Sequence, residues 1–128
     1  MRWAFCFCFP HASRWERIGH KVVETEIHRQ VPKDGGHFEQ SANYHVYALD
    51  MFLFYHVLAE TTDAYRARLK VMANFLDSLL GRSRRLPSFG DDDGGRFFHP
   101  HGCRDRFARA TLATFAALFR KLRRGRFP

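Results

Sequence analysis

The fold is decided by residues 43–60, NYHVYALDMFLFYHVLAE, near the middle of a chain of 128 residues. Wound as a helix, this stretch has apolar side chains on every side, and a helix without a polar face is buried on most sides. A buried pair of strands is the competing interpretation, but no turn signal interrupts the stretch. We therefore expect a buried central helix, in which Asp50 is paired because an unpaired buried carboxylate is costly.

The segment before this helix has the period of an amphipathic helix. Ser13 and Glu16 have the S-x-x-E spacing of a capping box, which would start that helix. The apolar residues of one face recur at three- and four-residue steps: Trp15, Ile18, Val22, Val23 and Ile27. Pro32 and the following Asp-Gly-Gly turn are expected to end the helix.

Two further helices are expected after the central one. Thr62 can cap a helix that runs to about Leu80, where Gly81 supplies the left-handed position. A last helix, from about Arg104 to Arg124, is expected to bury one set of side chains: Phe107, Phe115, Leu118, Phe119 and Leu122.

These helices predict an all-α protein. No alternating pattern of strand length is convincing, and a chain of this length is usually one domain. We expect a single helical domain over residues 1–128, with an acidic and glycine-rich loop at residues 82–103. Amphipathic helices around a buried one suit stacked helical hairpins, as in a toroid or solenoid.

Charge and hydropathy limit the partners. The net charge of +8 comes from residues 82–128, where twelve Lys/Arg face four Asp/Glu. A polyanion partner is one interpretation, and solvated arginines from a coding bias are the other. The longest strongly apolar run is residues 51–55, or at most 51–58 past His56. It is shorter than the roughly 20 residues that span a bilayer, so no membrane partner is expected. Residues 1–10 resemble a signal peptide but are short, aromatic and stopped by Pro10, so the compartment is left open.

Metal ions and cofactors are not expected. Cys6, Cys8 and Cys103 fit neither a disulfide framework nor a zinc knuckle and are read as free thiols. The spacing of His37 and Glu39 leaves no third metal ligand, and the consecutive acids of residues 91–93 do not alternate as in an EF-hand loop.

Two polar clusters are candidates for chemistry. Residues 34–45, DGGHFEQSANYH, lead into the buried helix, where polar groups can face a cleft while the helix is fixed in the core. The alternative is a helix cap, with Ser41 or Asn43 capping and Glu39 favoured by the helix dipole. Residues 86–96, LPSFGDDDGGR, indicate a tight turn tied to its own backbone, or an Asp–Arg pair at a cleft rim.

Together, in this order, the two clusters resemble the heparinase II/III family of polysaccharide lyases, over about residues 9–120. The resemblance implies a slice of an incomplete (α/α) toroid from the N-terminal part of such a protein. It implies β-elimination on uronic-acid polysaccharides such as heparan sulfate or alginate. In that reaction the substrate carboxylate is neutralised, a base removes the C5 proton, and a tyrosine typically protonates the leaving O4.

The resemblance also implies site residues. Tyr44 matches the family tyrosine and is the expected catalytic residue, while substrate-binding roles fall to His37, Glu39, His45 and Arg96. We expect Tyr44 and the 91–96 loop to approach the same concave surface. The family's Asn-His pair does not occur before Tyr44, and its β-sandwich would lie beyond Pro128. We therefore expect the 128 residues to be inactive alone and to self-associate through exposed apolar faces.

The alternative function is a non-catalytic basic helical module that binds polyanions. The concentration of arginine after residue 82 supports it, and arginine suits bidentate contacts with sulfate, carboxylate or phosphate. An acidic polysaccharide is the expected partner in either case. Nucleic acid is less favoured, because the chain has no recognised nucleic-acid-binding motif.

Overall fold

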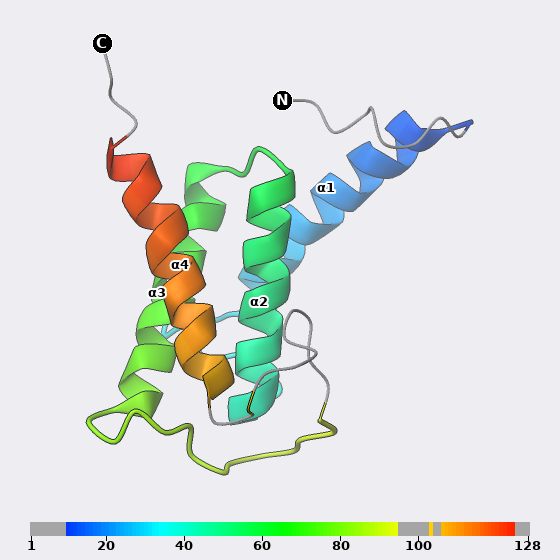
Figure 1. The fold of residues 1–128 in the computed structure, drawn as a ribbon. Helices are drawn as coiled ribbons and strands as arrows, with labels where there is room; N and C mark the ends of the chain where they lie inside the picture. The colour runs from blue at the N-terminus through cyan, green and yellow to red at the C-terminus, as the bar shows by residue number, and fades with distance from the viewer. Residues whose placement is uncertain (1–9, 95–102, 104–105, 125–128) are drawn as a thin grey trace.

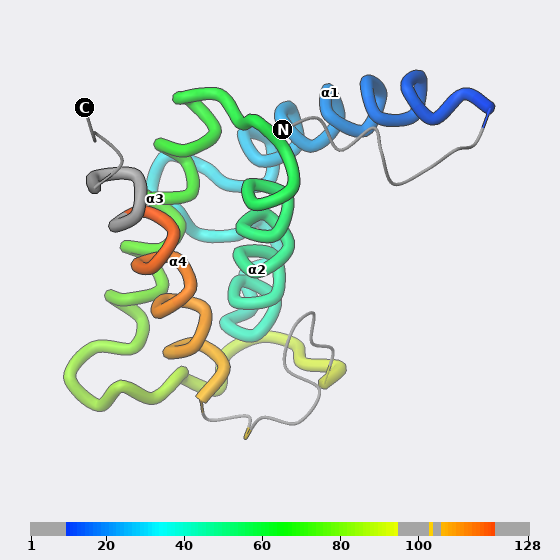
Figure 2. Tube along the Cα trace, turned by 45° about the horizontal axis from the view of Figure 1, so that its top comes forward, coloured from blue at the N-terminus to red at the C-terminus, as the bar shows by residue number. Residues whose placement is uncertain are grey.

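The computed structural model describes residues 10–94, 103 and 106–124, and every regular element in these residues is a helix. The four helices are α1 (Ala12–Gln30), α2 (Ala42–Leu58), α3 (Asp63–Leu80) and α4 (Phe107–Arg124). Helices α2, α3 and α4 pack against one another, and α1 extends away from them (Figures 1 and 2). The all-α prediction is confirmed, whereas the toroid remains a prediction.

Helix α2 is the most buried element, as its sequence predicts. Eight of its residues are buried, including Leu49 at 0% and Leu53 at 1% exposure, whereas α1 buries one, Ile27. Asp50 is also buried, at 6% exposure. The helix starts where Ser41 accepts a hydrogen bond from the Tyr44 backbone N–H, so a side-chain cap fixes its first turn.

Helix α3 forms the second wall of the core. The Thr62 hydroxyl accepts a hydrogen bond from the Tyr65 backbone N–H at 3.1 Å, which confirms the predicted cap. Thr62 also donates to Glu24 of α1 at 2.6 Å and so joins the two helices. The fully buried face of α3 consists of Tyr65, Leu69, Met72, Leu76 and Leu80.

Helix α4 covers the core opposite α1. Phe107 is buried at 8% exposure, and Phe115, Leu118 and Phe119 pack against the core while partly exposed. Arg104, where the helix was expected to begin, and the side chain of Leu122 lie outside the described part of the chain.

The start of α1 differs from the prediction. The helix begins at Ala12 after His11, whose carbonyl accepts from the backbone N–H groups of Arg14 and Trp15, and no side chain caps it. Ser13 therefore has a helical conformation, whereas a capping serine must lie outside the helix. The predicted capping box of Ser13 and Glu16 is wrong.

The apolar face of α1 is buried at its C-terminal end alone. Ile27 is fully buried and Val23 is half-buried, but Trp15, Ile18 and Val22 are 67%, 40% and 51% exposed. The exposed residues lie on the part of α1 that extends away from the other helices (Figure 1). The sequence correctly predicts an amphipathic helix here, but the described residues cover little of its apolar face.

None of the described helices combines the length and the apolarity needed to cross a bilayer.

Candidate functional site

The loop between α1 and α2 lies against α3. Its Phe38 N–H donates to the carbonyl of Gln30 at 2.9 Å. Gly35 has φ 93°, and a Cβ there would lie 2.5 Å from the carbonyl oxygen of Val71 in α3. A side chain at Gly35 would push the loop off α3, so the glycine allows the approach that places the first polar cluster.

The second polar cluster meets the first at the start of α2. The Ala42 N–H donates to the carbonyl of Phe89 at 3.0 Å, and the Ser41 hydroxyl donates to the carbonyl of Asp91 at 2.5 Å. A Cβ on Gly90 would lie 2.6 Å from the Cα of Ser41, so this approach also needs a glycine. The two clusters, about fifty residues apart in sequence, therefore form one surface.

Tyr44 lies at this junction and contacts the acidic loop as expected. Its hydroxyl donates to Oδ2 of Asp91 at 3.5 Å, a long hydrogen bond. Partial desolvation, the negative charges of Asp91, Asp93 and Glu39, and this hydrogen bond all raise the pKa of the Tyr44 hydroxyl. The hydroxyl therefore stays protonated near neutral pH, which suits a proton donor better than a base. Arg96 lies outside the described residues.

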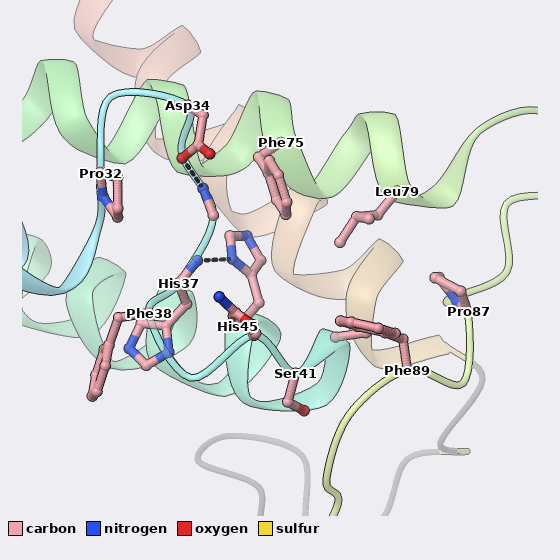
Figure 3. Close-up of a pocket in the computed structure, with 13 residues that line it drawn as sticks. Pro32, Asp34, His37, Phe38, Ser41, His45, Phe75, Leu79, Pro87 and Phe89 are labelled. Carbon is pink, nitrogen blue, oxygen red and sulfur yellow. Dashed lines mark hydrogen bonds between the residues drawn. The ribbon is translucent and has the colours of Figure 1, made fainter.

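His45 points into the core, although it is next to Tyr44 in sequence. It is 1% exposed, its Nδ1 accepts from the His37 backbone N–H at 3.3 Å, and its Nε2 lies 3.1 Å from the Met72 carbonyl (Figure 3). Burial lowers the pKa of His45 to about 4, so the ring is neutral and Nε2–H donates to Met72. In this arrangement His45 ties the loop to α3, whereas the resemblance implies a contact with substrate.

A pocket of about 470 Å³ opens beside the junction, between the α1–α2 loop, α3 and residues 87–89 (Figure 3). Its polar lining includes His37, Ser41 and His45. The apolar lining includes Pro32, Phe38, Phe75, Leu79, Pro87 and Phe89. Phe75 and Leu79 lie on α3, and the sequence does not predict that they line a pocket, because this depends on where the loop crosses α3.

Three of the expected site residues thus lie close together. The negative charge of Glu39 lies near enough to raise the pKa of Tyr44, and Nδ1 of His37 lies 3.6 Å from Oε2 of Glu39. In the described part of the chain, no group of three or more His, Cys, Asp and Glu residues is placed to hold a metal ion. Cys103 is a free, exposed thiol.

Replacing Ser41 by alanine should lower the free energy of unfolding by about 1–2 kcal/mol, because the cap of α2 and the bond to the Asp91 carbonyl are both lost. Urea unfolding measures this loss. Ser13→Ala is the control, since Ser13 is exposed inside α1 and alanine favours the helix. Equal losses in the two variants would contradict the capping role of Ser41.

Acidification should destabilise the chain through His45. Its folded pKa of about 4 lies below the ordinary 6.5, so between these pH values the unfolded chain binds more protons. The contribution of His45 to the free energy of unfolding is therefore fully present above pH 6.5. It falls by roughly 3 kcal/mol as the pH drops toward 4. Urea unfolding at several pH values measures the loss, which should shrink in His45→Asn. The control His28→Asn changes an exposed histidine, and this variant should lose as much stability on acidification as the original chain.

Comparisons with known proteins agree on one family. A family model described as the heparinase II/III N-terminus matches residues 4–95. A heparin-sulfate lyase of Pedobacter heparinus is 33% identical over 90 residues, which cover 65% of this chain and 14% of that protein. A heparin-sulfate lyase of Bacteroides stercoris is 32% identical over 71 residues, covering 56% and 10% respectively. The chain therefore spans a small part of the length of both relatives, and no solved structure matches it significantly.

Proposed function

Since the chain belongs to the heparinase II/III family, we propose that it supplies the proton-donating tyrosine of a polysaccharide lyase. The substrates we propose are uronic-acid polysaccharides, such as heparan sulfate or alginate. The observation that carries the proposal is the position of Tyr44 at the junction of the two loops, where its hydroxyl donates a hydrogen bond to Asp91. The names of the two relatives favour heparan sulfate as the first polymer to assay.

The chemistry assigns Tyr44 to the second half of the elimination. A base removes the C5 proton of the uronate, the C4–O4 bond breaks, and the leaving O4 needs a proton. Because partial desolvation and then its acidic neighbours raise its pKa further above the ordinary tyrosine value, the Tyr44 hydroxyl holds a proton for this step. Asp91 positions the hydroxyl, and Ser41 in turn holds the Asp91 backbone.

The uronate carboxylate must be neutralised before its C5 proton becomes acidic. The charged groups that act on Tyr44 are Asp91, Asp93 and Glu39, and all three are acidic. A positive group must therefore approach from elsewhere, and Arg96 is the residue of this chain that we propose for it. We also propose that His37, Glu39 and His45 contribute to substrate binding, His45 by supporting the loop that carries the other two.

A polypeptide of these 128 residues alone should show no measurable lyase activity. The family's Asn-His pair does not occur before Tyr44, so Arg96 alone would have to neutralise the carboxylate, and losing one stabilising donor typically lowers a rate by about a hundred- to thousand-fold. The acidic surroundings of Tyr44 also repel a uronate. The measurement is ultraviolet absorbance of the unsaturated uronate after incubation with heparan sulfate, hyaluronan and alginate. Robust turnover that disappears in Tyr44→Phe would contradict this expectation.

A chimaera tests the proposed function itself. Residues 4–95 replace the matching segment of the Pedobacter heparinus heparin-sulfate lyase, and formation of unsaturated product is followed. The proposal expects lyase activity that depends on Tyr44. A folded chimaera that forms no product on any uronic-acid polymer would contradict it.

A second candidate function is non-catalytic binding of polyanions. Arg82 and Arg85 are exposed after α3, and Arg106 and Arg109 are exposed at the start of α4. Titration of the chain with heparin and with DNA over a range of salt concentrations tests it. If salt weakens both equally, the binding is a general charge effect and not recognition of a glycan.

A further inference from the structure

A chain of hydrogen bonds determines which nitrogen of His37 carries the proton. The side-chain amide of Gln30 donates to Oε2 of Glu26 at 2.9 Å, so its Nε2 faces that carboxylate. Its Oε1 therefore faces Nε2 of His37, at 3.3 Å, and can act there only as an acceptor. His37 Nε2 must carry a hydrogen, and in the neutral ring Nδ1 is left as a lone-pair acceptor.

That acceptor has no donor in the described part of the chain. The His37 side chain is 5% exposed, and its Nδ1 is buried without a hydrogen-bond partner. The carboxylate of Glu39, 3.6 Å away, is another acceptor. Burial lowers the pKa of His37, more than Glu39 raises it, so a second proton on the ring is disfavoured near neutral pH. An unsatisfied buried acceptor is costly. His37 Nδ1 and the Glu39 carboxylate therefore need a hydrogen-bond donor that the described residues do not supply.

The same histidine lines the 470 Å³ pocket, where aromatic rings are close by (Figure 3). Phe38, Phe75 and Phe89 supply broad apolar faces, and a few polar groups among apolar walls are typical of a small-ligand site. Glu39 does not line the pocket, but its half-exposed carboxylate lies beside His37, where a ligand that reaches Nδ1 would meet it. The carboxylate of Asp34 in the lining and that of Glu39 beside it disfavour an anionic ligand by repulsion.

We propose that this pocket binds an uncharged sugar ring, with a hydroxyl or amide N–H of the sugar donating to His37 Nδ1 and Glu39. The apolar face of the ring packs against the phenylalanines of the pocket. The choice of a sugar rests on the proposed function. In a polymer that alternates uronate with hexosamine, the pocket takes the neutral hexosamine.

Nuclear magnetic resonance of the ¹⁵N-labelled 128-residue chain tests the proposal. N-acetylglucosamine should shift the His37 Nδ1 resonance and the backbone resonances of Phe38 and Phe89, saturably, with a Kd of about 1 mM or weaker. Glucuronate at the same concentration and ionic strength should shift none of them. If N-acetylglucosamine leaves the Nδ1 resonance unchanged, or both sugars act alike, the proposal is overturned.

Glu39→Gln is the decisive variant, because the new side-chain amide can donate to Nδ1 itself. In the sugar-free variant the Nδ1 resonance should already be shifted, and affinity for N-acetylglucosamine should fall at least about tenfold. Glu16→Gln removes the same charge from an exposed position on α1 and should bind like the original chain. Equal binding by both variants would overturn the proposal. The test follows binding and not turnover, so its failure leaves the Tyr44 proposal standing, and the reverse also holds.

Discussion

Replacing Tyr44 by phenylalanine should lower the rate of elimination by about a hundred- to ten-thousand-fold, the usual contribution of a positioned acid or base. The substitution removes the phenol hydroxyl that donates to Asp91 and that we propose as the proton donor to O4. In the chimaera described above, the loss should appear in kcat more than in KM, because the proton is transferred in the transition state and not on binding.

Tyr55→Phe is the matched control for this prediction. Tyr55 lies on the same helix, three turns further along, and its hydroxyl is hydrogen-bonded to Nδ1 of His20 in α1. The same oxygen atom is lost in both variants, so an effect on folding alone would lower both rates. If Tyr44→Phe keeps the activity of the unsubstituted chimaera, or if the two variants lose equal activity, Tyr44 is not the proton donor.

Replacing Leu49 by alanine should lower the free energy of unfolding by about 2–5 kcal/mol. Leu49 is 0% exposed in α2, so the substitution removes buried methyl groups and leaves a cavity among its core neighbours. Small domains are typically stable by about 5–15 kcal/mol, so this is a large fraction of the total. Urea unfolding should show a lower midpoint with an unchanged slope.

Met51→Ala controls for the change to alanine on the same helix. Met51 is 46% exposed, so most of the side chain is already in water. The loss in this variant should stay near 0.5 kcal/mol, as is usual for surface positions. If Met51→Ala costs as much as Leu49→Ala, the burial pattern of α2 is wrong.

The helices could be predicted from the sequence because their signals are local. The stretch around Leu49 has apolar residues on every side of a helix, which indicates a helix buried on most sides, and that is what α2 is. Thr62 marks the start of α3 through its side-chain cap, and Gly81 marks the end. Gly81 has a positive φ of 48°, but with ψ −150° it is not in the left-handed conformation that was expected. The start of α1 was mispredicted because a capping-box spacing also occurs inside a helix, where Ser13 lies.

The site was harder to predict because it depends on contacts between distant segments. Tyr44 and His45 are neighbours in sequence, yet one contacts the acidic loop and the other lies in the core. Their spacing places them on different sides of the helix but does not say which side faces the cleft. The crossing of the α1–α2 loop over α3 decides this, and the close approach at Gly35 fixes that crossing.

The uneven burial of α1 gives the helix two levels of local stability. Its first turns, which carry the exposed Trp15, Ile18 and Val22, have few core contacts to lose when their backbone opens. Amide hydrogens there should exchange with solvent by local fraying, at a small free-energy cost. In the last turns, Ile27 lies in the core and the Gln30 carbonyl accepts a hydrogen bond from the Phe38 N–H. Amide hydrogens there should therefore exchange only when the three packed helices also unfold. The site loop thus belongs to the slowly exchanging unit, and fraying of α1 leaves Tyr44 in place.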